Sequence, residues 1–415
     1  MNLISSVAPA MPSLLKATLL LSFSVASLSL SPMPVYAAPN KVKTHKDQAG
    51  WRLLVDGQPT MVFGMNWGYI PIGQNYAWVL WHQPEDVIKE ALKTEMPLLK
   101  AMGVNAIRQY PDIPPKWVEW IYQRYGIYTV INHTLGRYGI SVNGAWVAQT
   151  DYANPVIREA IIAEVDEVVL RYKETRGVLM YLLGNENNYG LSWTSFEAED
   201  LPEGERDLER ARPLYTLFGE VAQQIKKKDP HHPIAMANGD LGYIDLIATY
   251  CKSVDIMASN VYRGVSSRDL FDRVSKILDR PFMYSEFGAD AYNAKADRED
   301  SVAQAEYLRL QWQEIYEHSH NKGRSGVAIG GLIFQWSDGW WKYRQVERLE
   351  EHDTVATWGN EGYSHDYVKG ENNMNEEWFG IVAKDKPNDQ GLYQVRPRAA
   401  YYLLSEAFKL APYDA

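Results

Sequence analysis

Residues 178–190 read Val-Leu-Met-Tyr-Leu-Leu-Gly-Asn-Glu-Asn-Asn-Tyr-Gly, and this stretch decides which fold the chain adopts. Six apolar residues in a row, between Gly177 and Gly184, indicate a strand that is buried on both faces. The polar cluster that follows contains Glu186, and a carboxylate there is costly to bury unless it has a task. Because parallel barrels carry their chemistry at the C-terminal ends of their strands, the stretch predicts a barrel strand that ends in a functional carboxylate.

A second stretch of the same kind lies downstream, at Pro281-Phe-Met-Tyr-Ser-Glu-Phe-Gly-Ala-Asp290. It is again a short apolar run that ends in one carboxylate, Glu286. Glu186 and Glu286 are about three strand–helix units apart, if one unit takes roughly 30 residues, so their strand ends should face each other across a barrel mouth. Two carboxylates in this arrangement are the acid/base and the nucleophile that a retaining glycosidase needs. The alternative is a pair of buried structural glutamates.

The rest of the chain continues the alternation of apolar strands and amphipathic helices. This pattern predicts an α/β protein with a single (β/α)₈ barrel. A β-hairpin that turns at Asp56-Gly57 precedes the first strand and is expected to close the bottom of the barrel. The connection after strand eight is long and rich in aromatic residues, so we expect it to wall a cleft. The expected strands are residues 62–67, 104–110, 127–133, 178–183, 233–238, 254–262, 281–286 and 326–336.

Composition narrows the choice of partners. The formal net charge of −10 argues against nucleic acid and anionic membranes and suits a neutral substrate. The 14 Trp and 27 Tyr suit stacking on sugars, although most of them are expected in the core. A single cysteine, Cys251, excludes an internal disulfide, so stability must come from the core. The sequence has no zinc spacing, no phosphate-binding glycine loop and no Gly-x-Ser-x-Gly elbow, and we expect neither a metal nor a cofactor.

The N-terminus has the features of a secretory signal. Lys16 precedes an apolar stretch, residues 17–30, that is shorter than a membrane span, and Val35-Tyr36-Ala37 offers small residues for cleavage. We therefore expect residues 1–37 to be a signal peptide and residues 38–415 to be one catalytic domain. The expected protein is secreted or periplasmic, with no stable membrane insertion after cleavage. An uncleaved anchor is the alternative.

From Trp51 to Leu410, the strand ends taken together resemble the retaining glycoside hydrolases of clan A, most closely the catalytic TIM barrel of family 2. Gly184-Asn185-Glu186 is similar to the Asn-Glu pair of the clan, and Ser285-Glu286-Phe287-Gly288 is similar to its nucleophile motif. The resemblance implies that Glu186 is the acid/base and Glu286 the nucleophile.

The same resemblance implies roles for three further residues. Arg108 matches an arginine after strand two, Tyr262 a strand-six tyrosine beside the nucleophile, and Trp336 a strand-eight tryptophan under the sugar. In physical terms, Arg108 and Tyr262 would stabilise the Glu286 anion, whereas the like charge of Glu286 would keep a proton on Glu186.

Five more residues are candidates for substrate binding. Asn185 is placed to bond the sugar 2-hydroxyl, with a capping role in its loop as the alternative. His133 sits at a strand end and could bond a sugar hydroxyl, with a satisfied histidine of the barrel wall as the alternative. Trp67, Tyr69 and Asn260 are the remaining candidates.

The sequence also departs from family 2. Asn187 follows Glu186 where many relatives have proline, and too few residues precede Trp51 to hold the jelly-roll and immunoglobulin-like domains that usually come first. The two glutamate motifs also resemble the glucanosyltransferases of family 72, but the disulfide cysteines of that family are missing. Three functions remain open: a retaining β-glycosidase acting on a β-linked glucan or related oligo- or polysaccharide, a β-glucan transglycosylase with the same glutamates, and a non-catalytic carbohydrate-binding barrel.

Overall fold

The computed structural model describes residues 38–110, 112–191, 203–342, 344–410 and 412–413. The expected signal peptide, residues 1–37, lies outside the described residues. Within the described ranges, no helix is both long enough and apolar enough to cross a bilayer.

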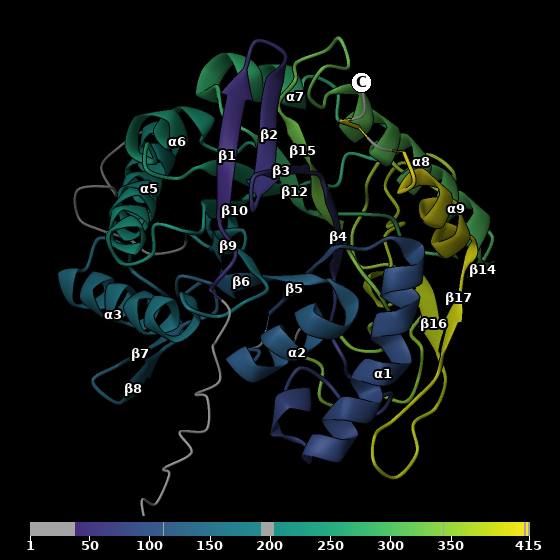
Figure 1. Ribbon diagram of the computed structural model, residues 1–415. Helices are drawn as coiled ribbons and strands as arrows, with labels where there is room; N and C mark the ends of the chain where they lie inside the picture. The colour runs from purple at the N-terminus through teal and green to yellow at the C-terminus, as the bar shows by residue number, and fades with distance from the viewer. Residues whose placement is uncertain (1–37, 111, 192–202, 343, 411, 414–415) are drawn as a thin grey trace, which may run out of the picture. The chain divides into compact units, whose positions relative to one another are not determined.

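Eight parallel strands form a closed barrel, as the sequence predicts (Figure 1). Each strand pairs with its neighbour in parallel register, and the last strand returns to the first through pairs such as Gly330 with Val62. In order around the barrel, the strands are β4 (Val62–Asn66), β5 (Ala106–Gln109), β6 (Tyr128–His133), β9 (Val178–Leu183), β10 (Ile234–Gly239), β11 (Ile256–Asn260), β12 (Phe282–Phe287) and β15 (Ala328–Ile333).

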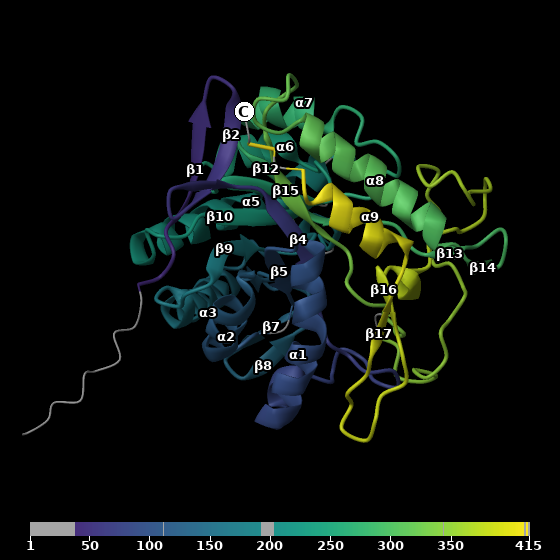
Figure 2. The ribbon, with the colours of Figure 1, turned by 45° about the vertical axis from the view of Figure 1, so that its right-hand side comes forward.

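Helices cover the outside of the barrel, and their ends follow from local sequence. α1 ends at Gly103 and α2 at Gly126, both in the left-handed conformation that favours glycine, while the side chain of Asn154 caps the start of α3. Although distant in sequence, α8 and α9 lie side by side (Figure 2). The helices are α1 (Glu85–Met102), α2 (Pro115–Tyr125), α3 (Pro155–Tyr172), α5 (Glu203–Lys228), α6 (Ile244–Tyr250), α7 (Leu270–Arg273), α8 (Ser301–Glu317) and α9 (Ala399–Ala407).

The strand period of two divides the core into two layers. Small and branched side chains such as Ala106, Val130 and Ala258 fill the inside of the barrel. Larger side chains such as Tyr181 and Trp312 fill the layer between the strands and the helices. A residue near a strand end can therefore enter either layer, and its sequence position alone does not decide which.

A three-stranded sheet closes the bottom of the barrel. The predicted hairpin is β2 (Gly50–Val55) paired with β3 (Gln58–Thr60), and β1 (Val42–Asp47) adds an outer strand that the sequence analysis did not predict. Leu53 and Val55 pack with the residues inside the barrel, so the hairpin plugs the end away from the glutamates.

The long connection after β15 is anchored by a buried ion pair. Arg398, just before α9, donates to both carboxylate oxygens of Asp338 at 2.7 and 2.8 Å, and their side chains are 4% and 1% exposed. The same guanidinium also donates to the Gly380 carbonyl at 2.7 Å. The segment between these residues contains η4 (Glu376–Trp378), β16 (Val382–Lys384) and β17 (Val395–Pro397).

Asp338→Ala should lower the free energy of unfolding by about 3 kcal/mol, because it leaves a buried guanidinium without its main partner. Urea denaturation followed by tryptophan fluorescence measures this change. Glu406→Ala, which breaks the exposed pair with Lys409, is the matched control and should change the free energy by less than about 1 kcal/mol. Equal losses in the two variants would contradict the anchoring role.

Candidate active site

A buried arginine gathers the candidate site at the C-terminal ends of the strands. Arg108, on β5, is wholly buried, and each part of its guanidinium has a partner. Nε donates to Asn132 at 2.9 Å, Nη1 to Glu286 at 3.0 Å and Nη2 to Asn185 at 2.8 Å. Residues from three other strand ends thus converge on this one cation.

Three donors hold the carboxylate of Glu286. Oε1 accepts from Arg108 Nη1 and from the Tyr110 hydroxyl, and Oε2 accepts from the Tyr262 hydroxyl at 3.1 Å. Glu286 is 7% exposed. Both oxygens of this carboxylate are therefore fixed in direction by charged or hydroxyl donors.

Glu186 lies in a different environment. It follows β9 with a left-handed backbone (φ 55°), and its Oε1 accepts from Asn260 Nδ2 at 3.1 Å. Burial and, as the second cause, the charge of Glu286 raise its pKa to about 7. The sequence analysis had named the like charge as the cause; burial is the larger contribution. Glu186 therefore holds a proton up to about neutral pH.

Asn260 connects the two glutamates. It pairs with Glu286 in the register of β11 and β12, and its Oδ1 accepts from Ser285 Oγ at 2.7 Å. Its Nδ2 lies 3.1 Å from both Glu186 Oε1 and Asn185 Oδ1. Both acids thus belong to one hydrogen-bonded network at the mouth of the barrel.

Two tyrosines of the site were not predicted as site residues. Tyr110 follows Arg108 by two positions, so the strand period could have placed it on the same side. Tyr138 accepts from Asn185 Nδ2 at 2.7 Å. Burial is the main cause that raises the pKa of Tyr138, and the charges of Glu286 and Glu186 add to it, which places the phenol near both acids. It comes from the loop after β6, where the sequence carries no signal for it.

The position of Trp336 corrects the expectation that it lies under the sugar. Its side chain is wholly buried in the layer between barrel and helices, with its ring 6.3 Å from that of Tyr401 on α9. Large apolar rings fit this layer. The aromatic wall beside Tyr262 is instead formed by partly buried Phe334 and Trp358, which pack with Phe379. Trp358 and Asn360 belong to the long loop, and Asn360 donates to the Tyr262 carbonyl at 2.8 Å.

Trp67, Tyr69 and His133 also need correction, because the structure places them outside the site. Trp67 is 1% exposed and donates to Glu95 at 2.7 Å, and Tyr69 stacks on the buried ring of Tyr393. His133 accepts from the Leu135 amide and lies 3.4 Å from Glu164 on α3. Trp67 and His133 turn towards helices α1 and α3, and Tyr69, in the loop after β4, packs against the segment that carries Tyr393. Among the described residues, no cluster of His, Cys, Asp and Glu could hold a metal ion.

The family model described as "Glycosyl hydrolases family 2, TIM barrel domain" matches residues 85–324, more than half of the chain. The chain belongs to glycosyl hydrolase family 2. A β-galactosidase of Actinobacillus pleuropneumoniae is 21% identical over 329 residues, a match that covers 73% of this chain and 27% of the β-galactosidase.

Solved structures show the same fold at low identity. The family 2 β-galacturonidase of Eisenbergiella tayi, bound to galacturonate, has a TM-score of 0.53 and 17% identity. The matched region covers 90% of this chain and 55% of the β-galacturonidase chain. A β-glucuronidase of Bacteroides uniformis has a TM-score of 0.57 and 13% identity. The matched region covers 88% of this chain and 37% of the β-glucuronidase chain. The chain spans between 27% and 55% of the length of these three relatives.

Glu286→Gln should lower the pKa of Glu186 below its wild-type value of about 7 while leaving it above the ordinary 4.5. The variant removes the like charge, but burial, the larger cause, remains. Carbon-13 NMR of glutamate carboxyls, assigned with Glu186→Gln, measures this titration. Glu286→Asp keeps the negative charge, so the pKa of Glu186 should stay close to 7. A wild-type Glu186 that titrates near 4.5 would contradict the described environment.

Proposed function

We propose that the chain is a retaining β-glycosidase that hydrolyses a β-linked glucan or a related polysaccharide by double displacement. The observation that carries the proposal is the pair of glutamates in one network with opposite environments. Three donors bind the carboxylate of Glu286, whereas burial and, second, the charge of Glu286 raise the pKa of Glu186 to about 7. A nucleophile needs an ionised carboxylate, and a general acid needs a protonated carboxyl at the same pH.

In the first step, a carboxylate oxygen of Glu286 attacks the anomeric carbon, and the bond to the leaving oxygen breaks. Glu186 gives its proton to that oxygen, so an alcohol departs and a glycosyl ester remains on Glu286. Arg108 and the two tyrosines orient the attacking carboxylate. A retaining pair works with carboxyls about 5–5.5 Å apart.

In the second step, Glu186 acts as the base. Once Glu286 is esterified, its negative charge is gone, and with it the second cause of the raised pKa of Glu186. Glu186 therefore becomes more acidic and takes a proton from water as the water oxygen attacks the anomeric carbon. The ester bond breaks, the Glu286 carboxylate returns, and the sugar leaves with its original configuration.

Asn185 is the proposed partner of the sugar 2-hydroxyl. Its Oδ1 is fixed by Arg108 and Asn260, which fixes the direction of its amide group. Its Nδ2 donates to the Tyr138 hydroxyl, a contact that a sugar hydroxyl can share or replace. Contacts to this hydroxyl strengthen in the transition state of retaining enzymes.

A neutral sugar is the substrate that the surroundings favour. The wall beside Tyr262 is aromatic, and Arg108 is wholly buried by its bonds to Glu286, Asn185 and Asn132. Arg263 is paired with Asp240 at 2.6 Å. The net charge of −10 also opposes the approach of anionic uronides. The uronic acids named for the structural relatives are therefore not the sugars proposed for this chain.

A second candidate function is transglycosylation, in which a sugar hydroxyl instead of water attacks the ester. The exposed Tyr189 lies three residues after Glu186 and offers a ring on which an acceptor sugar could stack. Products longer than the starting oligosaccharide would identify this activity. A non-catalytic carbohydrate-binding barrel, the third possibility, would release no reducing sugar from a panel of β-glucans.

Glu286→Gln should reduce turnover by at least about a thousandfold while leaving substrate binding intact, because it removes the nucleophile and keeps the shape. Glu186→Ala should retain turnover of aryl glycosides with good leaving groups, which need no proton, and azide should rescue it with formation of a β-azido sugar. Kinetics with and without azide, and NMR of the product, measure both effects. An α-azido product would reject Glu186 as the acid/base, because azide forms that product when it replaces a missing nucleophile. Near wild-type turnover in Glu286→Gln would reject Glu286 as the nucleophile.

A further inference from the structure

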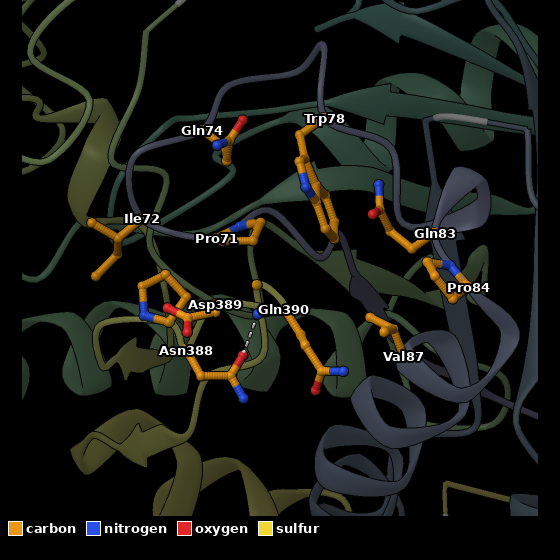
Figure 3. A pocket seen from close by; sticks show the side chains of 12 residues that line it. Pro71, Ile72, Gln74, Trp78, Gln83, Pro84, Val87, Asn388, Asp389 and Gln390 are labelled. Carbon is orange, nitrogen blue, oxygen red and sulfur yellow. Dashed lines mark hydrogen bonds between the residues drawn. The ribbon is translucent and has the colours of Figure 1, made fainter.

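A cavity of about 340 Å³ lies on a different part of the barrel from the glutamate pair. The loop between β4 and α1 forms one side of it, with Trp78, Gln74 and Gln83 (Figure 3). The loop between β16 and β17 forms the other side, with Asp389 and Gln390. This volume lies within the range of about 300–1,000 Å³ that small-molecule sites span. None of the residues that line it belongs to the Arg108 network.

The cavity walls are fixed in place by contacts within the protein. Lys384 Nζ donates to the Ile70 carbonyl at 2.8 Å, and the amide of Tyr393 donates to the Tyr69 hydroxyl at 3.1 Å. The backbone of Gly391 approaches Trp78 so closely that a Cβ there would lie 3.3 Å from the ring. The two loops therefore form a preformed site, which costs a ligand little ordering energy.

The chemistry of the lining fits a sugar. One indole ring stands among side-chain amides and one carboxylate, and flat apolar faces with nearby polar groups are what pyranose rings stack on and bond to. The residues that line the cavity, all of them described, include no Lys, Arg or His. An anionic ligand would meet Asp389 with no cation to offset it, so the lining favours a neutral saccharide.

One wall of the cavity is a loop that begins at the catalytic end of the barrel. β4 ends at Asn66, whose Nδ2 donates to the carbonyl of Ser285, the neighbour of Glu286. The loop that carries Trp78 leaves from this residue. A polysaccharide bound in the cleft would therefore have a second attachment point on the same end of the molecule.

We propose that this cavity is a second saccharide-binding site, distinct from the catalytic cleft, which takes a neutral β-linked oligosaccharide through stacking on Trp78. The choice of a β-linked glucan rests on the proposed function. The site would keep a long substrate close to the glutamates between turnovers.

Calorimetric titration of Glu286→Gln with cellotetraose and with laminaritetraose tests the proposal, because this variant binds without cleaving. Two sites per chain are expected with at least one of these sugars. Adding Trp78→Ala should weaken one of them by about three- to tenfold and leave the other unchanged. In chains with an intact Glu286, Trp78→Ala should lower the ratio of polymer turnover to aryl-glycoside turnover.

The ring of Trp78 also packs against the ring of Tyr69, with centroids 6.0 Å apart, so Trp78→Ala removes a packing contact together with the proposed binding surface. A second variant therefore leaves Trp78 in place. Asp389→Ala combined with Gln390→Ala changes only exposed side chains of the loop and should weaken the same site. Tyr402→Ala, which removes an exposed aromatic ring from α9, is the matched control and should change neither site.

A single site that neither cavity variant weakens, in a wild-type chain that hydrolyses these sugars, would overturn the second site and leave the proposed function intact. Two sites with no hydrolysis by the wild type would reject the proposed function while supporting the second site.

Discussion

The buried guanidinium of Arg108 is the interaction on which the arrangement of the site depends. A cation with no exposed surface is costly unless every donor is paired, and its partners come from β6, β12 and the residue after β9. These bonds require the strand ends to meet at one height in the barrel. The positions of Asn185 and Glu286 follow from this requirement, and Asn260 then brings Glu186 into the same network.

The network places the two glutamates, Glu286 and Glu186, in different environments. Glu286 receives a cation and two hydroxyls, whereas the partner of the Glu186 carboxylate is one amide. Burial is the larger cause of the raised pKa of Glu186, so part of the asymmetry persists when the charge of Glu286 is lost. The charge-dependent part is the one that changes during the proposed reaction. The raised pKa of Glu186 thus has one contribution that stays constant, from burial, and one that is lost when Glu286 is esterified, from its charge.

Much of the barrel could be predicted from sequence, because its signals are local. Continuous apolar runs such as residues 178–183 indicate buried parallel strands, and glycines such as Gly103 mark helix ends. The two glutamates stood out because each follows such a run. β1 escaped prediction because its sequence, Val-Lys-Thr-His-Lys-Asp, is mostly polar and forms an outer strand.

The finer assignment of the site could not be predicted, because it depends on which layer each side chain enters. Trp336 and Trp67 lie near strand ends, yet both point to the helices, where a large ring fills space. Phe334 and Trp358 form the aromatic wall, and Trp358 comes from a loop whose path no local pattern specifies. The cavity beside Trp78 could not be predicted for a similar reason, since the loops that form its two walls are more than three hundred residues apart in sequence.

The central claim is that Glu286 forms a covalent bond to the sugar, while Glu186 handles the proton. Mass spectrometry of peptides from protein inactivated with the 2-deoxy-2-fluoro derivative of a sugar that the chain hydrolyses tests this claim most directly. One glycosyl group per chain, attached to Glu286, is the predicted result. A label on Glu186 or on any other residue, or inactivation without a covalent adduct, would contradict it.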